Sequence, residues 1–259
     1  MSNLVKIFAT DRLLSWLLPV TLVLVWQAAA QLGWLSTRIL PAPLDVLKVG
    51  IQLASTGELY HHFLASFKRA ITGLLIGGSI GFLLGFVTGL SRLAQNLLDS
   101  SIQMVRNVPL LALVPLVILW FGIGEGGKIF LVALAVFFPI YLNTFHGLRS
   151  VDQDLIEMGR TYGLSQFALF REVILPGAMP SILVGLRMSL GYMWLFLVVA
   201  ETISANEGIG YMTMNAREFL QTDVMVLGIA IYALLGKSSD VLAGMLERHC
   251  LKWHRGYQT

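Results

Sequence analysis

Long apolar stretches, separated by short polar segments, dominate the chain of 259 residues. Four of these stretches contain no charged residue over a length that suits a membrane-spanning helix, which needs ~20 predominantly apolar residues. Two more, 178–200 and 224–246, carry one cation each, Arg187 and Lys237. The pattern predicts an all-α polytopic membrane protein in which 1–259 form a single transmembrane domain. The six expected spans are about 13–33, 70–90, 107–124, 128–148, 178–203 and 223–246.

The first apolar stretch has two possible roles. Lys6 and Arg12 before it, and the alanines at 28–30 after it, resemble the parts of a cleavable signal peptide. The stretch is longer than the roughly 7–15 apolar residues of a signal core, and further spans follow it. We therefore expect a retained first helix.

Composition and charge support a membrane protein. Hydrophobic residues make up 56% of the chain and charged residues only 13%, whereas soluble domains are about 25% charged. There are 18 Lys and Arg against 15 Asp and Glu, without a clustered basic stripe, so no nucleic-acid partner is expected. Cys250 is the single cysteine, and the histidines lack a ligand spacing, so no metal site is expected.

The placement of Lys and Arg predicts the orientation of the spans. With the N-terminus inside, more of these cations fall in cytoplasmic segments than in segments on the opposite side. We therefore expect both termini and the long connection 149–176 to be cytoplasmic.

Glycines recur at every fourth position of the second expected span. With 3.6 residues per turn they form a slowly drifting stripe without side chains. In lipid such a stripe lets another helix approach closely, and the sequence leaves open whether that helix belongs to the same chain or to a second copy. This glycine stripe comprises Gly73, Gly77, Gly81, Gly85 and Gly89.

The connection 149–176 is predicted to form a helical hairpin. Asp152 can cap its first helix and Gly163 can end it. Ser165 can cap a second helix, which we expect to end before Pro176 because proline cannot continue the hydrogen-bond ladder. The apolar side of this hairpin should lie either on the membrane surface or in a groove of a partner protein.

The same connection resembles the EAA loop of ATP-binding-cassette importer permeases. That pattern reads Glu-Ala-Ala, three residues, Gly, nine residues, Ile, any residue, Leu-Pro. The chain has Glu157, Gly163, Leu175 and Pro176 at these spacings and departs from the pattern at positions 158, 159 and 173. Other segments, at 34–41, 106–109, 115–122 and 200–206, are similar to the sulfonate, taurine and nitrate branch of the family. Within this branch, the segments 208–211 and 215–223 are most similar to aliphatic sulfonate permeases.

This resemblance implies a type I importer permease with the MetI-like fold, which is a non-catalytic subunit of the bacterial inner membrane. Its implied cargo is an aliphatic sulfonate, or alternatively taurine or nitrate. The implied partners are a second permease copy, two ATPase subunits that bind ATP and Mg, and an extracytoplasmic substrate-binding protein. Lipid surrounds the spans, and the chain itself holds no cofactor.

The resemblance also assigns the hairpin to coupling with the ATPases. Glu157 and Gly163 would fix its geometry, while Leu164, Phe167 and Phe170 would enter a groove of the ATPase.

Charged residues in or beside spans are functional candidates. Glu201 stands at the outer end of the fifth expected span, and we expect it to pair with Arg217 to hold an outer gate. Arg187 can extend to the cytoplasmic interface, and Lys237 can neutralise Asp240 three positions later.

Two other classes of membrane protein fit less well. An ion-coupled secondary transporter would need carboxylates near the membrane midplane, and the first four expected spans contain none. An intramembrane hydrolase would need a nucleophile with an adjacent base, and His146 has no evident partner.

Overall fold

The computed structural model describes residues 2–253, and this range contains helices and no strand. The all-α prediction is therefore confirmed for the described chain. These residues form two compact units, one of 2–62 with 212–230 and the other of 63–211 with 231–253.

The first unit is built around α2 (Pro43–Ser55). Pro43 lies in the first turn of α2, where the missing proline N–H would have had no helical partner. The N–H of Leu44 donates to the Gln27 side chain at 3.1 Å and joins α2 to α1. The unit also contains α1 (Ser2–Gln31), the start of α3 (Glu58–Leu90), most of α10 (Ile209–Glu218) and the start of α11 (Thr222–Cys250).

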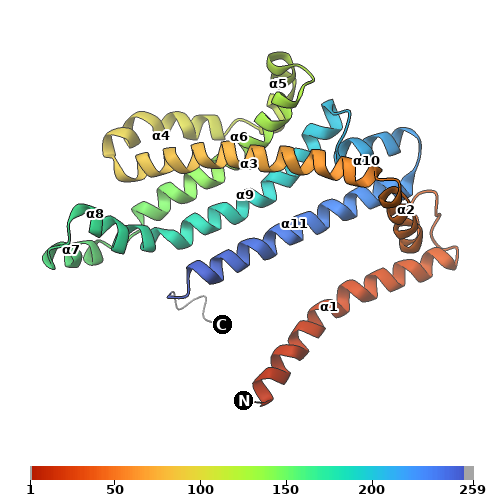
Figure 1. Ribbon diagram of the computed structural model, residues 1–259, viewed down its shortest axis with the longest axis horizontal. Coiled ribbons are helices and arrows are strands. Elements are labelled where there is room, and N and C mark those ends of the chain that lie inside the picture. Colours follow the sequence, from red (N-terminus) through yellow and green to blue (C-terminus); the bar gives the residue numbers. More distant parts are fainter. Residues whose placement is uncertain (1, 254–259) are drawn as a thin grey trace. The chain divides into compact units, whose positions relative to one another are not determined.

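The second unit is built on α3, α6 (Glu125–Arg149) and α9 (Leu175–Ser204), and α6 and α9 lie side by side along much of their length (Figure 1). Hydroxyl groups join the helices in addition to apolar contacts. Ser189 donates to the Val136 carbonyl at 3.1 Å, and Trp194 donates to Ser239 of α11 at 2.8 Å. Such interhelical hydrogen bonds supplement van der Waals packing in lipid, where helices gain no hydrophobic drive to associate. The core contains Ala70, Val132, Val136, Ile140, Met193, Trp194 and Leu197.

The glycine stripe lies against α6 of the same chain, which identifies its neighbouring helix. A β-carbon at Gly81 would lie 2.6 Å from the Phe137 carbonyl oxygen, and one at Gly85 would lie 2.6 Å from that of Tyr141. At Gly77 a β-carbon would overlap the backbone of Ala133. Contacts this short with backbone atoms leave no room for a side chain.

Four helical segments in the described range are long and apolar enough to cross a membrane: α3, α6, α11 and the continuous run Gln166–Ile203. A bent segment, made of α4 (Arg92–Arg106) and the helical turns at Leu110–Phe121, would make a fifth. In α1 the described apolar part, Leu17–Gln31, is shorter than these. The predicted count of six is therefore approximate.

The third expected span, 107–124, is not one straight helix. It consists of η1 (Leu110–Leu113) and α5 (Val114–Phe121). The helical run formed by these two elements is bent by 84° relative to α4. Pro109 adopts an extended backbone and lacks an N–H, so it separates α4 from the turns that follow. The connection expected at 91–106 is itself helical, and Ser91 caps it by accepting from the Ala94 N–H at 3.3 Å.

Replacing Gly81 by Leu tests the glycine contact. Because the added side chain would meet the α6 backbone, we expect Gly81→Leu to destabilise the protein by about 1–3 kcal/mol through overpacking. Thermal unfolding of the purified protein in detergent measures this change. Gly244→Leu in α11 is the matched control, since no atom lies within 4 Å of a β-carbon there. Equal stability of the two variants would contradict the close α3–α6 contact.

Candidate functional site

The hairpin over 149–176 has the caps that its sequence predicts. Asp152 accepts from the Asp154 N–H at 2.9 Å at the start of α7 (Gln153–Thr161). Gly163 has φ +79°, a left-handed conformation that glycine adopts readily, and it ends the first arm of the hairpin. Ser165 accepts from the Ala168 N–H at 3.3 Å at the start of α8 (Gln166–Leu169).

The second arm does not end before Pro176, which corrects the sequence prediction. Helix α8 continues through the π-helical turn η2 (Phe170–Ile174) directly into α9, so that one helical run extends from the hairpin through the following span. Proline in a regular α-helix removes one hydrogen bond and clashes with the carbonyl four positions earlier. The wider π turn immediately before Pro176 relieves this conflict.

One side of the hairpin packs against its own chain. Gly159 is buried, and a β-carbon there would lie 2.7 Å from Leu169 Cδ1. The Phe170 ring meets Phe86 of α3 edge-on, with centroids 5.4 Å apart. Phe170 therefore faces the helical core rather than the surface on which we had expected it, and Leu169 is a buried neighbour that the sequence pattern did not reveal.

The opposite side of the hairpin is exposed and apolar. The exposed fraction is 73% for Phe167 and 81% for Tyr162, while Leu164 is half-buried. Leu155 and Met158 are also exposed, and with Tyr162 they follow the i, i+3, i+7 spacing of one helix face. This spacing is visible in the sequence and could have predicted that α7 also contributes apolar side chains to the exposed surface.

A hollow of about 680 Å³ lies on this side of the hairpin. Its walls include Leu155, Met158, Tyr162 and Leu164 from the hairpin, Pro176 at the start of α9, and Trp253. The apolar surface of the hairpin is thus hollowed, as a surface that receives another protein would be.

Glu157 lies on the exposed surface of α7. Its backbone carbonyl accepts from the Thr161 hydroxyl at 2.9 Å, while its carboxylate makes no ion pair with any residue of the described range. The carboxylate therefore does not hold the hairpin together, and it remains available to a partner.

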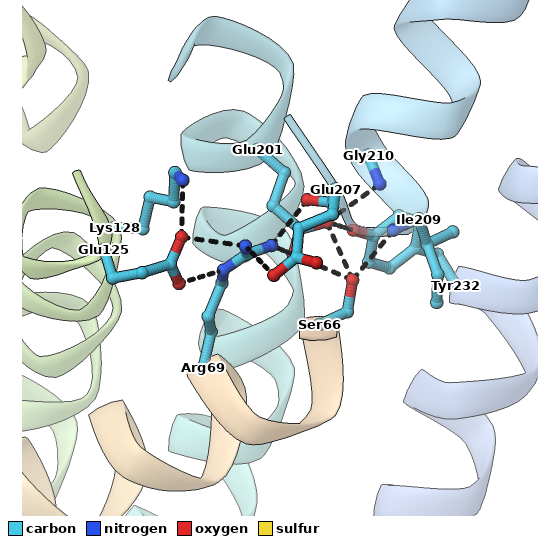
Figure 2. Close-up of polar contacts among 9 residues, drawn as sticks. All are labelled: Ser66, Arg69, Glu125, Lys128, Glu201, Glu207, Ile209, Gly210 and Tyr232. Carbon is cyan, nitrogen blue, oxygen red and sulfur yellow. Dashed lines mark hydrogen bonds and ion pairs between the residues drawn. The ribbon is translucent and has the colours of Figure 1, made fainter. Parts of the chain in front are cut away.

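The second candidate site is a buried ion network centred on Arg69 of α3 (Figure 2). Arg69 is 2% exposed and Glu201 of α9 is 1% exposed. Arg69 Nη1 donates to Glu201 at 2.8 Å, and its Nε and Nη2 donate to Glu125 of α6 at 2.5 and 2.8 Å. Nη1 also donates to the Glu207 backbone carbonyl at 2.6 Å, and Lys128 donates to Glu125 at 2.7 Å.

Three donors besides Arg69 surround the Glu201 carboxylate: the Ser66 hydroxyl, the Gly210 N–H and the Tyr232 hydroxyl. Ser66 lies 2.8 Å from both carboxylate oxygens and accepts from the Ile209 N–H at 2.8 Å. The Gly210 N–H and the Tyr232 hydroxyl donate to Oε2 at 2.9 and 3.0 Å. A buried carboxylate is tolerated only when it is paired and hydrogen-bonded in this way.

The network joins α3, α6 and α9 near the end where α6 begins and α9 ends. The sequence predicted Glu201 as a gate residue but did not identify Arg69 as its cationic partner. The structure pairs Glu201 with Arg69. Arg217 belongs to the other unit, where its guanidinium donates to Met214 Sδ at 3.8 Å. The sequence around Arg69 does not indicate its acidic partners, because Glu125 and Glu201 lie more than fifty positions away.

Arg187 of α9 belongs to a separate ion cluster with α11. Its Nη2 lies 2.6 Å from Asp240 and its Nη1 lies 3.2 Å from Glu247. The expected pair of Lys237 with Asp240 is also present, at 3.6 Å. Arg187 therefore has carboxylate partners within the chain.

Comparison with known families decides what this helical chain is. The family described as binding-protein-dependent transport system inner membrane component matches residues 64–252. The chain belongs to this family. The membrane fold and the hairpin described above are therefore those of a transport permease, a non-catalytic membrane subunit, as the EAA resemblance implied.

Relatives of this permease extend over nearly the whole chain. The Escherichia coli (strain K12) protein named as aliphatic sulfonates transport permease SsuC is 61% identical over 246 residues, covering 95% of this chain and 94% of its own. The Bacillus subtilis (strain 168) protein of the same name is 44% identical and covers 93% of this chain and 88% of its own. The E. coli (strain K12) taurine transport system permease TauC is 39% identical, covering 90% and 86%.

Solved structures of other importers share the fold of the permease. An inward-facing MetNI methionine ABC transporter aligns with a TM-score of 0.50 and 18% identity, over 73% of this chain and 94% of that one. An amino acid ABC transporter with histidines aligns with a TM-score of 0.51 and 19% identity, over 80% and 97%. The predicted type I importer permease fold is confirmed.

Breaking the buried network should destabilise the permease. Glu201→Gln removes the buried carboxylate among the acidic partners of Arg69, and loss of one partner of a buried ion pair costs about 3–5 kcal/mol. We expect a correspondingly lower midpoint of thermal unfolding in lipid nanodiscs. Asp45→Asn is the control, because its pair with Lys48 is solvent-exposed and such pairs contribute about 0–1 kcal/mol. A midpoint for Glu201→Gln as high as that of the control would show that the network contributes no stability.

Proposed function

We propose that this permease forms the translocation path for aliphatic sulfonates in an ATP-driven importer. The observation that carries this proposal is the 61% identity, over 95% of the chain, with an aliphatic sulfonates transport permease. The B. subtilis relative of the same name supports the same cargo from a more distant sequence. Taurine, itself a sulfonate, is the second candidate, favoured by the 39% identity with a taurine permease.

The energy for transport would come from two separate ATPase subunits that bind ATP and Mg. The exposed apolar residues of the hairpin, with Phe167 and Tyr162 foremost, are suited to docking in a groove of such a partner. The free carboxylate of Glu157 can meet a cation of the ATPase. Because α8 runs through η2 into α9, a movement imposed on the hairpin would pass along one helix into the membrane.

The remaining partners follow from the same importer architecture. A second copy of the permease would complete the translocation path, and an extracytoplasmic binding protein would deliver the sulfonate. Exposed apolar side chains on α11, such as Leu234, Leu242 and Met245, suit contact with lipid or with the second copy. The hairpin and both termini would lie in the cytoplasm, where ATP is available.

Uptake by the importer in proteoliposomes tests the function. With ATPase subunits and binding protein present, the wild-type importer should accumulate radiolabelled ethanesulfonate only when ATP is supplied, and nitrate should not compete. Gly163→Pro should bring this uptake to background, because proline cannot adopt φ +79° and lacks the N–H that donates to the Arg160 carbonyl at 2.9 Å. Stimulation of ATP hydrolysis by the loaded binding protein should be lost with it.

Gly57→Pro provides a matched control for the strained turn. Gly57 has φ +82° and its N–H donates to the Ala54 carbonyl at 3.2 Å, but it lies between α2 and α3, away from the hairpin in sequence. This variant should retain association with the ATPases. Uptake driven by an ion gradient without ATP would refute the importer, and preferential uptake of taurine would favour the second cargo. Normal uptake by Gly163→Pro would refute coupling through the hairpin.

Thiol labelling in intact cells tests the orientation. Single cysteines replace Gly57, Gln166, Asn206 or Gln258 in a background in which Cys250 is changed to serine. A membrane-impermeant reagent should label positions 57 and 206 in intact cells, and positions 166 and 258 only after the cells are opened. Gly57, Gln166 and Asn206 are exposed, so access by the reagent depends on the side of the membrane. Labelling at 166 in intact cells would place the hairpin away from ATP and contradict the coupling.

A further inference from the structure

We propose that a cavity between α6 and α9, with Arg106 at its wall, binds the anionic head of the sulfonate on its way through the permease. This inference rests on the proposed function and assigns the substrate a site within the membrane subunit. It also gives Arg106 a role that neither its position in the sequence nor the coupling hairpin explains.

The cavity has a volume of about 320 Å³. Helix α6 contributes Phe138, Leu142 and Asn143 to its wall, and α9 contributes Met188 and Tyr192. Arg106, at the end of α4, and Leu110, in η1, line its open side from the bent segment. Small-molecule sites are typically cavities of roughly 300–1,000 Å³ lined by apolar side chains with a few polar groups, and this cavity has that composition at the small end of the range.

Arg106 is the cation of this wall and has no counter-charge in the described part of the chain. The other arginines considered above differ from it, because Arg69 and Arg187 each contact carboxylates. Its place in the last turn of α4 favours a cation there through the helix dipole, but this does not explain why it borders an apolar cavity. Arg106 is exposed, so its unpaired guanidinium is accessible to an anion at the mouth of the cavity. We assign that anion to the ligand.

Two neutral donors accompany Arg106 at the cavity wall. The Asn143 side-chain nitrogen donates one hydrogen to the Pro139 carbonyl at 2.8 Å, which orients the amide and leaves its second hydrogen available. The Tyr192 hydroxyl makes no hydrogen bond with any residue of the described range. No carboxylate lines the cavity, in contrast to the Arg69 network. A sulfonate head offers three acceptor oxygens, which these donors can share.

The apolar wall selects for the rest of the ligand. Leu110, Phe138, Met188 and Phe196 surround the space with aliphatic and aromatic surface, which suits a short alkyl chain. A phospholipid also joins an anionic head to apolar chains, but the small volume favours a compact molecule over a lipid with two long tails. The cavity therefore matches an alkanesulfonate.

Arg106→Gln tests the assignment in the complete importer, with ATPases and binding protein, in proteoliposomes. At saturating ethanesulfonate we expect uptake to fall by about tenfold, as for loss of one charge-assisted hydrogen bond, while the loaded binding protein still stimulates ATP hydrolysis. Arg106→Lys should keep more of the uptake, because the charge remains. Arg92→Gln, at the other end of α4 and outside the cavity wall, is the matched control and should leave both activities unchanged.

A second variant tests the apolar wall. Met188 is 46% exposed, so Met188→Ala should fold normally and enlarge the cavity. We expect it to raise the uptake of a longer alkanesulfonate, such as octanesulfonate, relative to ethanesulfonate. An unchanged ratio would show that the cavity does not contact the alkyl chain and would overturn this part of the assignment.

The outcomes separate the site from the function on which it rests. Sulfonate uptake by the wild type with equal uptake by Arg106→Gln and Arg92→Gln would overturn the site and leave the proposed function standing. Absence of sulfonate uptake by the wild type would overturn both. Vesicles of phosphatidylcholine alone, compared with vesicles that also contain phosphatidylglycerol, distinguish the source of the anion. A defect of Arg106→Gln that occurs only with phosphatidylglycerol would assign the anion to lipid and overturn the substrate site.

Discussion

The close approach of α3 to α6 is the contact on which the second unit depends. Apolar side chains gain nothing by leaving lipid, so these helices must associate through close van der Waals contact and hydrogen bonds. At Gly77, Gly81 and Gly85 the α6 backbone occupies the space that a side chain would need. This contact brings α3 near enough for Arg69 to reach Glu125 on α6 and Glu201 on α9. The ion network therefore depends on the close packing of α3 against α6.

The arginines of the second unit occupy different electrostatic environments. Arg69 is surrounded by carboxylates and backbone acceptors, and Arg187 is shared between Asp240 and Glu247 of α11. In these ion pairs each guanidinium is already bonded to carboxylates of the chain. The pairs hold helices together and leave few donors for a ligand. Arg106 borders an apolar cavity without a carboxylate, so its charge can act on a molecule from outside the chain. This contrast, rather than the number of charges, distinguishes structural cations from a candidate binding group.

The second arm of the hairpin and α9 form one continuous helical run. The run Gln166–Ile203 begins in the hairpin, passes the cavity at Met188 and Tyr192, and reaches Glu201 near its end. A helix transmits displacement along its axis because each turn is hydrogen-bonded to the next. The π turn at Phe170–Ile174 is the irregular point in this connection, and Pro176 explains its position. The hairpin, the cavity and the buried network thus share one structural element.

Much of this protein could be predicted from the sequence because the signals are local. Hydrophobic runs predicted the helices, Asp152, Ser165 and Gly163 predicted the hairpin caps, and the four-residue glycine spacing predicted close packing. The EAA spacing of Glu157, Gly163, Leu175 and Pro176 indicated the family. These features depend on backbone geometry or helix period within a few turns, which a linear pattern records.

The tertiary structure alone decided how distant positions meet. It identified α6 as the partner of the glycine stripe, gave Glu201 the cation Arg69, turned Phe170 toward Phe86, and continued the helix through Pro176. It also placed Arg106 at a cavity whose other walls come from α6 and α9. Each of these outcomes depends on which helix faces are brought together in space. The local sequence does not show how a buried charge is neutralised, since water or a distant side chain can do so. It also does not show how a helix accommodates a proline, which a widened turn can achieve.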